Sequence, residues 1–557
     1  MISFYITYKK FYPIFIADEI IIPYGFNPFD ICQDNPILWH YIKIIFIISY
    51  FISNIVISNL IYSRFLKKIN IFKTSQKKIK IKNTNFKKQD QINLLIGKNN
   101  NNEKITLPEL GLYQNILITG TIGSGKTSSA MYPFTEQFIK YNSENSEKIG
   151  MLILDVKGNY YNQVRQYAQK YNLEKDLIVI ELNSNVFYNP LHKPNLKPQV
   201  LANRIKTILT LFSENNSESY WLDKVEQIFT EAIKICRIYN NNYVTFLELN
   251  KLITDENYFY SKLKIIKNLF ISNRLNKNEI YELNSSLNFF QKEFFNLDQR
   301  TKGILISEIT RITNTFISDY DVVNTFCSSQ EKLSFKGFEE VLDKGKIVVL
   351  NMNIAEYELL SKIIAAYLKL DFQSEVLQNL SKNNCKKSVF ICDEYDKYCT
   401  KNDGNFFSTS REAKCINIIS TQSYSSLKNT LKDEASVKVI IQNLINKIWF
   451  RTDDLFTIEE AQKQLGKEDK EKISKTISEN AQETKFSYIT NSLNSRNSNI
   501  SETYNTYLQN DFIFETNYFT QKLETFTALT FLSDGNKILK PEKLYLFPYF
   551  KEKGHSL

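Results

Sequence analysis

Residues 116–134 read "ILITGTIGSGKTSSAMYPF". An apolar run typical of a buried strand leads into a glycine-rich turn, and a helix-like segment follows. The turn, residues 120–127, fits the pattern G-x-x-x-x-G-K-[ST], in which glycine lets backbone N–H groups converge on an anion. The chain has only 15 glycines in 557 residues, so a chance glycine-rich turn at this place is a weak alternative. The stretch predicts a loop that holds the phosphates of a nucleoside triphosphate.

The side chains of this loop have distinct expected tasks. Lys126 would neutralise the β and γ phosphate oxygens, and the Thr127 hydroxyl would bind Mg²⁺. The N-terminus of the following helix adds a dipole that attracts the phosphates. The expected nucleotide-binding residues are Gly120, Thr121, Ile122, Gly123, Ser124, Gly125, Lys126 and Thr127.

A phosphate loop needs a metal-holding acid on a neighbouring strand, and "SVFICDEYD", residues 388–396, supplies one. Asp393 would hold Mg²⁺ through its water shell, and Glu394 would polarise the attacking water. Asp155, at the end of the apolar run "MLILD", is the alternative metal-holding acid. Because two consecutive acids suit hydrolysis better, Asp393 and Glu394 are preferred.

Three further polar residues are candidates for the hydrolytic step. Gln422 follows the apolar run "IIST" and could sense the γ-phosphate, although a hydrogen-bonded loop amide is nearly as good an interpretation. Arg411 precedes that run and could reach the nucleotide of the next subunit in a ring-shaped ATPase. Arg451 is a second candidate for this arginine. A surface salt bridge is an equally good interpretation for each arginine.

Short apolar strands alternating with helices predict an α/β fold with a parallel, two-sided sheet. The alternation of strands and helices stops between residues 201 and 335, where only helical patterns such as "YWLDKVEQIFTEAIKICRIY" occur. The sequence therefore predicts a RecA-like nucleotide-binding domain, residues 106–200 and 336–557, with an inserted all-α domain. Residues 478–506, rich in Ser, Asn and Thr, are expected to form a loop.

The N-terminal part carries a membrane signal. Ile44–Ser63 contain no charged residue, and twenty helical residues cover the roughly 30 Å of a bilayer core. A long buried core helix is the alternative. The apolar patch at residues 11–26 contains two acids, so the sequence is compatible with either one or two membrane spans. We expect a membrane anchor over residues 1–63, with its main span at about 42–63.

A basic juxtamembrane tether, residues 64–105, follows this anchor. Ten basic residues arrive before the first acid, Asp90, and equal the formal net charge of +10. Such charge collects on cytoplasmic flanks, so the bulk of the chain should lie inside the cell membrane. The seven cysteines include no C-x-x-C pair, which argues against metal binding and suits reduced thiols in a cytosolic compartment. The ten basic residues are Arg64, Lys67, Lys68, Lys73, Lys77, Lys78, Lys80, Lys82, Lys87 and Lys88.

Taken together, these motifs resemble the type IV coupling proteins of bacterial conjugation and secretion (TraG/TraD-like), within the FtsK/HerA group of P-loop ATPases. The likeness extends over nearly the whole chain and rests on "GTIGSGKTSSAMYP", "LDVKGNYY", "FYNPL", "FFNLDQRTKGILISEITRITNTF", "FICDEYDKY", "STSREAK" and "STQSYSSL" in that order. Two positions depart from the family pattern. Asn159 stands where an acid usually follows Lys157-Gly158, and "REAKC" lacks the glycine common after the arginine.

The resemblance implies a hexameric ATPase that uses ATP and Mg²⁺. It further implies that hydrolysis drives single-stranded DNA with its bound relaxase, or an effector protein, into a type IV secretion channel at the inner membrane. One alternative is a duplex DNA translocase like FtsK, which would normally carry more membrane spans and a C-terminal winged-helix module. The other is a substrate receptor that binds nucleotide only as a switch. Glu394 beside Asp393 argues against the switch.

Overall fold

The computed structural model describes residues 91–155, 158–212, 219–352, 354–382, 384–479, 485–487, 492–494 and 500–550, with isolated positions between 41 and 52. The chain divides into two units, residues 1–87 and 88–557. The predicted membrane span and residues 64–90 of the predicted tether lie outside the described residues, apart from those isolated positions. Among the described residues, no helix is both long enough and apolar enough to cross a membrane.

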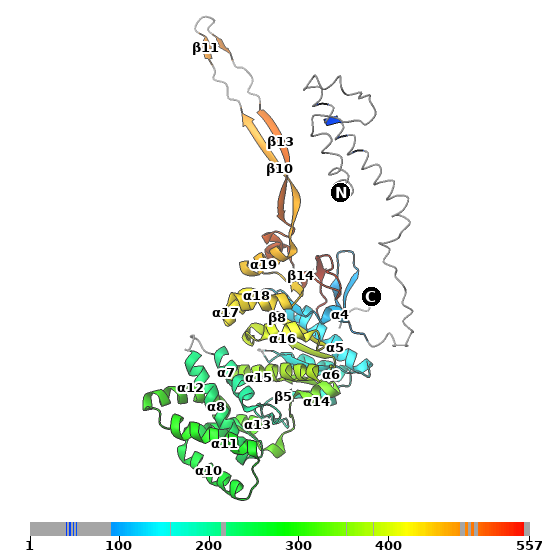
Figure 1. The fold of residues 1–557 in the computed structure, drawn as a ribbon. Helices are drawn as coiled ribbons and strands as arrows, with labels where there is room; N and C mark the ends of the chain where they lie inside the picture. The colour runs from blue at the N-terminus through cyan, green and yellow to red at the C-terminus, as the bar shows by residue number, and fades with distance from the viewer. Residues whose placement is uncertain are drawn as a thin grey trace, which may run out of the picture. The chain divides into compact units, whose positions relative to one another are not determined.

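The second unit is built on one eleven-stranded sheet (Figure 1). Seven neighbouring strands run parallel, and four antiparallel strands extend the sheet at one side. The parallel part has the order β9 (Asn446–Trp449), β3 (Ile116–Thr119), β8 (Cys415–Thr421), β7 (Ser388–Cys392), β4 (Gly150–Leu154), β6 (Ile347–Leu350) and β5 (Leu177–Ile180). The antiparallel part has the order β2 (Lys104–Pro108), β1 (Asn93–Lys98), β15 (Glu542–Tyr545) and β14 (Thr527–Phe531).

The central strands are buried along their whole length and mostly apolar because both faces of the sheet are covered. Alternate residues of β3 enter two separate hydrophobic cores, Ile116 and Ile118 in one and Leu117 in the other. Helices α5 (Tyr132–Glu144) and α6 (Tyr160–Lys170) pack on the first face. The second face is covered by α15 (Ile354–Ser381), α16 (Asp403–Ser410), α17 (Tyr424–Leu431) and α18 (Glu434–Asn443). The expected α/β fold is confirmed.

Between the neighbouring strands β5 and β6 the chain forms a helical region (Figure 1). Its core joins the second face of the sheet without a break, and Phe246 stacks on Phe316 with ring centroids 4.1 Å apart. The helices are α7 (Pro198–Leu211), α8 (Ser219–Tyr239), α9 (Phe246–Thr254), α10 (Glu256–Ile271), α11 (Lys277–Asn288), α12 (Gln299–Ile317), α13 (Tyr320–Phe326) and α14 (Phe338–Lys344).

The sheet begins earlier than the sequence indicates. Strand β1 and the first two residues of β2 lie within residues 64–105, the range expected to be a basic tether. Strand β1 pairs with β2 on one side and with β15 on the other. The polar run "GKNNNNEK" contains the turn between β1 and β2 rather than a linker. The signal for β1 is a short apolar run, residues 94–96, between basic and polar stretches, and β2 at the sheet margin buries only Leu107.

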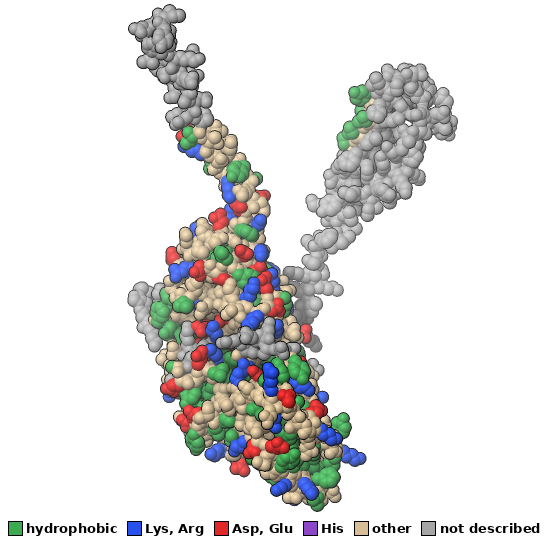
Figure 2. Space-filling view, turned by 90° about the vertical axis from the view of Figure 1, so that its left-hand side faces the viewer, with side chains coloured by type: hydrophobic (Ala, Val, Ile, Leu, Met, Phe, Trp, Pro, Cys, Tyr) green, Lys and Arg blue, Asp and Glu red, His purple; other side chains and the backbone are tan. Residues whose placement is uncertain are grey.

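The expectation of a loop at residues 478–506 is wrong where the structure describes it. Strand β10 (Lys467–Glu479) pairs with β13 (Ile500–Phe512) over thirteen residues in a two-stranded antiparallel ribbon of its own. Short strands β11 (Lys485–Ser487) and β12 (Ser492–Asn494) pair beyond it. The register places Ile473, Leu508 and Tyr504 on one face, where they are 60–69% exposed. Figure 2 shows hydrophobic side chains at the surface of the ribbon.

A buried lysine in β9 makes the stability of this sheet pH-dependent. Lys447 is 1% exposed, and its ammonium donates hydrogen bonds to the carbonyl oxygens of Ile441 and Leu444. Burial lowers the pKa of Lys447 to about 7. The folded chain therefore releases a proton that the unfolded chain keeps until about pH 10.4.

We expect the free energy of unfolding to rise between pH 7 and pH 9 by up to about 1.4 kcal/mol per pH unit, because the unfolded chain binds more protons there. Lys447→Met removes this contribution, so the variant should show a flatter profile in denaturant titrations at pH 7, 8 and 9. The same pH slope in both proteins would contradict the assignment.

Candidate nucleotide-binding site

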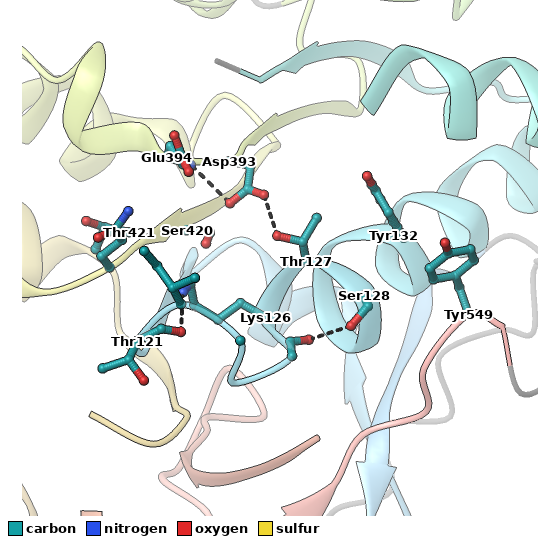
Figure 3. Close-up of a pocket in the computed structure, with 14 residues that line it drawn as sticks. Thr121, Lys126, Thr127, Ser128, Tyr132, Asp393, Glu394, Ser420, Thr421 and Tyr549 are labelled. Atoms are coloured by element: carbon teal, nitrogen blue, oxygen red, sulfur yellow. Dashed lines mark hydrogen bonds between the residues drawn. The ribbon is translucent and has the colours of Figure 1, made fainter. Parts of the chain in front are cut away.

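The phosphate-binding loop lies between the carboxyl end of β3 and a helix (Figure 3). Gly123 and Gly125 have φ values of 78° and 101°, which side chains of other residues rarely adopt. A Cβ atom at Gly125 would also lie 2.6 Å from Cδ1 of Phe526. Glycine is therefore required at Gly125 for two reasons and at Gly123 for one.

Internal hydrogen bonds hold the loop in this shape. The Lys126 ammonium donates to the carbonyl oxygens of Gly120 and Thr121, the latter at 3.1 Å. The Ser124 hydroxyl donates to the Thr121 carbonyl at 2.7 Å, and the Thr121 amide donates to the Arg451 carbonyl at 2.8 Å. Contacts within the chain thus fix the shape of the loop, and the Lys126 ammonium lies against its backbone.

Pro133 explains an irregular start of the helix. Thr127–Met131 are wound as a π-helix, and the Tyr132 amide donates to the Thr127 carbonyl five residues back. Proline has no N–H to continue the α-helical ladder, and its ring excludes the carbonyl of the previous turn. The wider first turn accommodates Pro133 at the beginning of α5 without ending the helix.

The structure brings Asp393 and Glu394 to the loop. Strand β7 is separated from β3 by β8 alone, and all three end at the same edge of the sheet. The Thr127 hydroxyl donates to Oδ2 of Asp393 at 2.7 Å, and the Glu394 amide donates to Oδ1 at 3.0 Å (Figure 3). Glu394 itself adopts the left-handed conformation, with φ 48°. Hydroxyl and carboxylate oxygens side by side are the ligand types that Mg²⁺ prefers.

The alternative acid, Asp155, has a different environment. Its carboxylate accepts a hydrogen bond from the Tyr160 amide at 3.3 Å, at the start of α6, and the side chain is 9% exposed. It does not line the cavity at the phosphate-binding loop. The geometry therefore favours Asp393 over Asp155 as the acid beside Thr127.

A cavity of about 310 Å³ opens above the loop. The sequence did not single out the aromatic residues Tyr132 and Tyr549, whose rings lie edge to face at 5.2 Å. The Tyr549 amide donates to the Ser128 carbonyl at 3.0 Å. Nothing in the pattern around Tyr549 signals this long-range contact. The lining residues are Thr121, Ile122, Gly123, Gly125, Lys126, Thr127, Ser128, Tyr132, Asp393, Glu394, Ser420, Thr421, Gln422 and Tyr549.

The environment of Tyr132 shows how acidic this end of the cavity is. Burial, together with the nearby charges of Asp155 and Asp393, raises the pKa of Tyr132 to about 12. The phenol therefore stays protonated at neutral pH and can only donate or accept hydrogen bonds. A cation between the acids and the phosphates would relieve their charge.

The remaining predicted residues lie at different places. Gln422 lines the cavity, and its backbone carbonyl accepts a hydrogen bond from the Gly120 amide at 3.3 Å. Arg451 follows β9, is exposed, and contacts Thr121 through its backbone carbonyl. Arg411 is exposed at the end of α16, before β8 begins, and thus at the opposite edge of the parallel strands. The chain's own fold does not bring Arg411 to its cavity.

Comparisons with known proteins found similarity in one family model and in several solved structures. A family model described as the TraM recognition site of TraD and TraG matches residues 387–509. The search of curated proteins found no match. The resemblance to the conjugative coupling proteins is confirmed by this model together with the fold described next.

Solved structures of the conjugative coupling protein TrwB share the fold. The unbound monoclinic form, lacking 70 N-terminal residues, has a TM-score of 0.54 at 11% identity and covers 81% of this chain and 88% of that chain. TrwB with a non-hydrolysable GTP analogue has a TM-score of 0.52 at 10% identity and covers 79% and 87%. TrwB with ADP and Mg²⁺ has a TM-score of 0.52 at 10% identity and covers 79% and 86%.

We expect Gly125→Ala to weaken ATP binding much more than Gly123→Ala does. Both changes force a side chain into positive φ, at a cost of about 1 kcal/mol each, but only the first also collides with Phe526. Titration with a fluorescent ATP analogue should show at least about a tenfold larger loss of affinity for Gly125→Ala. Equal losses for the two variants would contradict the packing argument.

Proposed function

We propose that the chain is a coupling ATPase of bacterial conjugation. In this account it hydrolyses ATP to recruit single-stranded DNA with its relaxase, or a protein substrate, and to move it into a type IV secretion channel. The observation that carries the proposal is the hydrogen bond between Thr127 and Asp393, the two side chains proposed to hold the metal, in a cavity that Lys126 and Glu394 also line. The fold shared with TrwB supports it.

ATP and Mg²⁺ fit the residues of the cavity. The loop amides and the Lys126 ammonium would bind the β and γ phosphates, and Thr127 with Asp393 would hold the metal. Mg²⁺, when bound, neutralises charge on the phosphates. Two of the TrwB structures are complexes, one with a non-hydrolysable GTP analogue and one with ADP and Mg²⁺.

Glu394 is the proposed general base. It lines the cavity next to Asp393 and has a left-handed backbone conformation. A carboxylate there would polarise the attacking water and accept its proton. A chain that used nucleotide only as a switch would have less need of such a base.

Gln422 and Arg411 have proposed roles on two sides of the γ-phosphate. Gln422 is in the same cavity and would sense the γ-phosphate. Arg411 lies at the far edge of its own strands, so it can serve a nucleotide only on a neighbouring copy. This placement agrees with a ring, proposed here as a homohexamer. Arg451 contacts the phosphate-binding loop of its own chain through its backbone carbonyl. It is therefore the less suitable candidate for the arginine that reaches a neighbouring nucleotide.

The cellular setting follows from the N-terminal sequence. The uncharged stretch at residues 44–63 and the ten basic residues after it would anchor the motor at the inner membrane, with the bulk of the chain in the cytoplasm. The proposed partners are relaxase-bound DNA and inner-membrane components of the channel. Stimulation of ATPase activity by duplex rather than single-stranded DNA would instead favour the translocase alternative.

We expect Glu394→Gln to bind ATP with near wild-type affinity and to lose about 10²-fold or more in kcat, because only the proton acceptor is removed. Lys126→Ala should lose both binding and turnover. Steady-state phosphate release and ATP titration separate the two effects. Glu174→Gln, on the exposed surface, is the matched control and should be unchanged. Full turnover in Glu394→Gln would exclude Glu394 as the base.

Mixing two inactive variants tests the trans-acting arginine. Lys126→Ala and Arg411→Ala should each be inactive alone. In mixed rings, about a quarter of the sites would combine an intact loop with an intact arginine from the neighbour and regain turnover. Sedimentation confirms co-assembly. Co-assembled mixtures that stay inactive would show that Arg411 does not act across the interface.

A further inference from the structure

A fully buried ion pair contacts the segment that follows Asp393 and Glu394. Lys369 of α15 and Asp403 at the start of α16 are both 0% exposed, and Nζ lies 2.6 Å from Oδ2. Removing two charges from water is costly, and a buried pair often adds less stability than apolar residues of similar volume would. The pair has no part in the hydrolytic step described above.

The pair is the centre of a hydrogen-bond network. Oδ2 of Asp403 accepts hydrogen bonds from the Thr400 amide, at 2.8 Å, and from the Tyr395 hydroxyl. Oδ1 accepts Nε2 of Gln373 at 3.1 Å. The Lys369 ammonium also donates to the carbonyl of Tyr398. Tyr395 and Thr400, at the two ends of the segment 395–400, are thus bound to Asp403 of α16, and Tyr398 is bound to Lys369 of α15.

This segment starts immediately after the proposed base. Glu394 has φ 48° and ψ 45°, a left-handed conformation that is unfavourable for a residue with a side chain. Such a conformation persists only where the surroundings fix it. Tyr395, the next residue, is fully buried, and its hydroxyl bond to Asp403 fixes the direction in which the chain leaves Glu394.

The same segment reaches the neighbouring strand. The Thr421 hydroxyl at the end of β8 donates to Oδ1 of Asp396 at 3.0 Å, and Thr421 is followed by Gln422. Glu394 directly precedes the segment 395–400, and Gln422 directly follows a residue that is hydrogen-bonded to it. The two cavity-lining side chains, the Glu394 carboxylate and the Gln422 amide, are therefore both connected to the segment that the buried pair holds.

We propose that Lys369 and Asp403 are positioning residues, which set the backbone at Glu394 so that its carboxylate points into the nucleotide cavity. This inference rests on the proposed ATPase function. It assigns the buried charges to catalytic geometry rather than to stability, so they should affect turnover more than nucleotide binding.

A second buried acid on α15 provides a matched control. Asp371 is 7% exposed, binds Arg204 of α7 at 3.2 Å and Lys193 at 2.5 Å, and faces the helical region. Removing the Arg204–Asp371 pair disturbs the same helix, α15, and takes away a comparable number of charges. None of its partners belongs to the segment 395–400.

The test compares the double variants Lys369→Met/Asp403→Asn and Arg204→Met/Asp371→Asn in the full chain. We expect the first to lose about tenfold or more in kcat with KM for ATP within about threefold of wild type. The second should keep kcat within about threefold. Thermal unfolding of both is measured in parallel. Tyr395→Phe removes one hydroxyl bond and should lower kcat several-fold with an unchanged melting temperature.

Unchanged kcat in both Lys369→Met/Asp403→Asn and Tyr395→Phe would overturn the inference. A parallel rise in KM and fall in melting temperature would also overturn it, because that pattern indicates a purely structural pair. If the double variant does not fold, Tyr395→Phe alone decides. Wild-type protein without turnover would instead refute the proposed ATPase function, and the inference would fall with it.

Discussion

The hydrogen bond from Thr127 to Asp393 joins two segments that are 266 residues apart in the sequence. It forms because β3 and β7 are separated by β8 alone and end at the same edge of a parallel sheet. Everything that makes the cavity suitable for a metal nucleotide depends on this closeness. Lys126 approaches from one side and Glu394 from the other.

The helical region is inserted without disturbing that geometry. It leaves the sheet after β5 and returns at β6, so the strands on either side of the insertion remain neighbours. Helix α15 then carries the chain back across the sheet, with Asp371 facing the helical region and Lys369 facing the segment after Glu394. One helix therefore contacts both the inserted region and the proposed catalytic loop.

Much of the site could be predicted from the sequence because its signals are local. The glycine-rich loop and the acids after an apolar strand need only a few adjacent residues. The contributions of Tyr549 and Ser420 to the cavity could not be predicted, since they depend on which distant segments meet. Strands β10 and β13 were missed because they are rich in polar residues and form an exposed ribbon with no buried face to predict. Strand β1 was missed because its short apolar run, residues 94–96, lies between a basic stretch and a polar run.

A double-mutant cycle on metal binding tests the central contact most directly. Mn²⁺–ATP binding, followed by electron paramagnetic resonance, is measured for wild type, Thr127→Val, Asp393→Asn and the double variant. If the two side chains hold one ion, each single change should weaken binding about tenfold or more, and the double variant should be little worse than either. Additive losses, or wild-type binding in Asp393→Asn, would contradict a shared metal site.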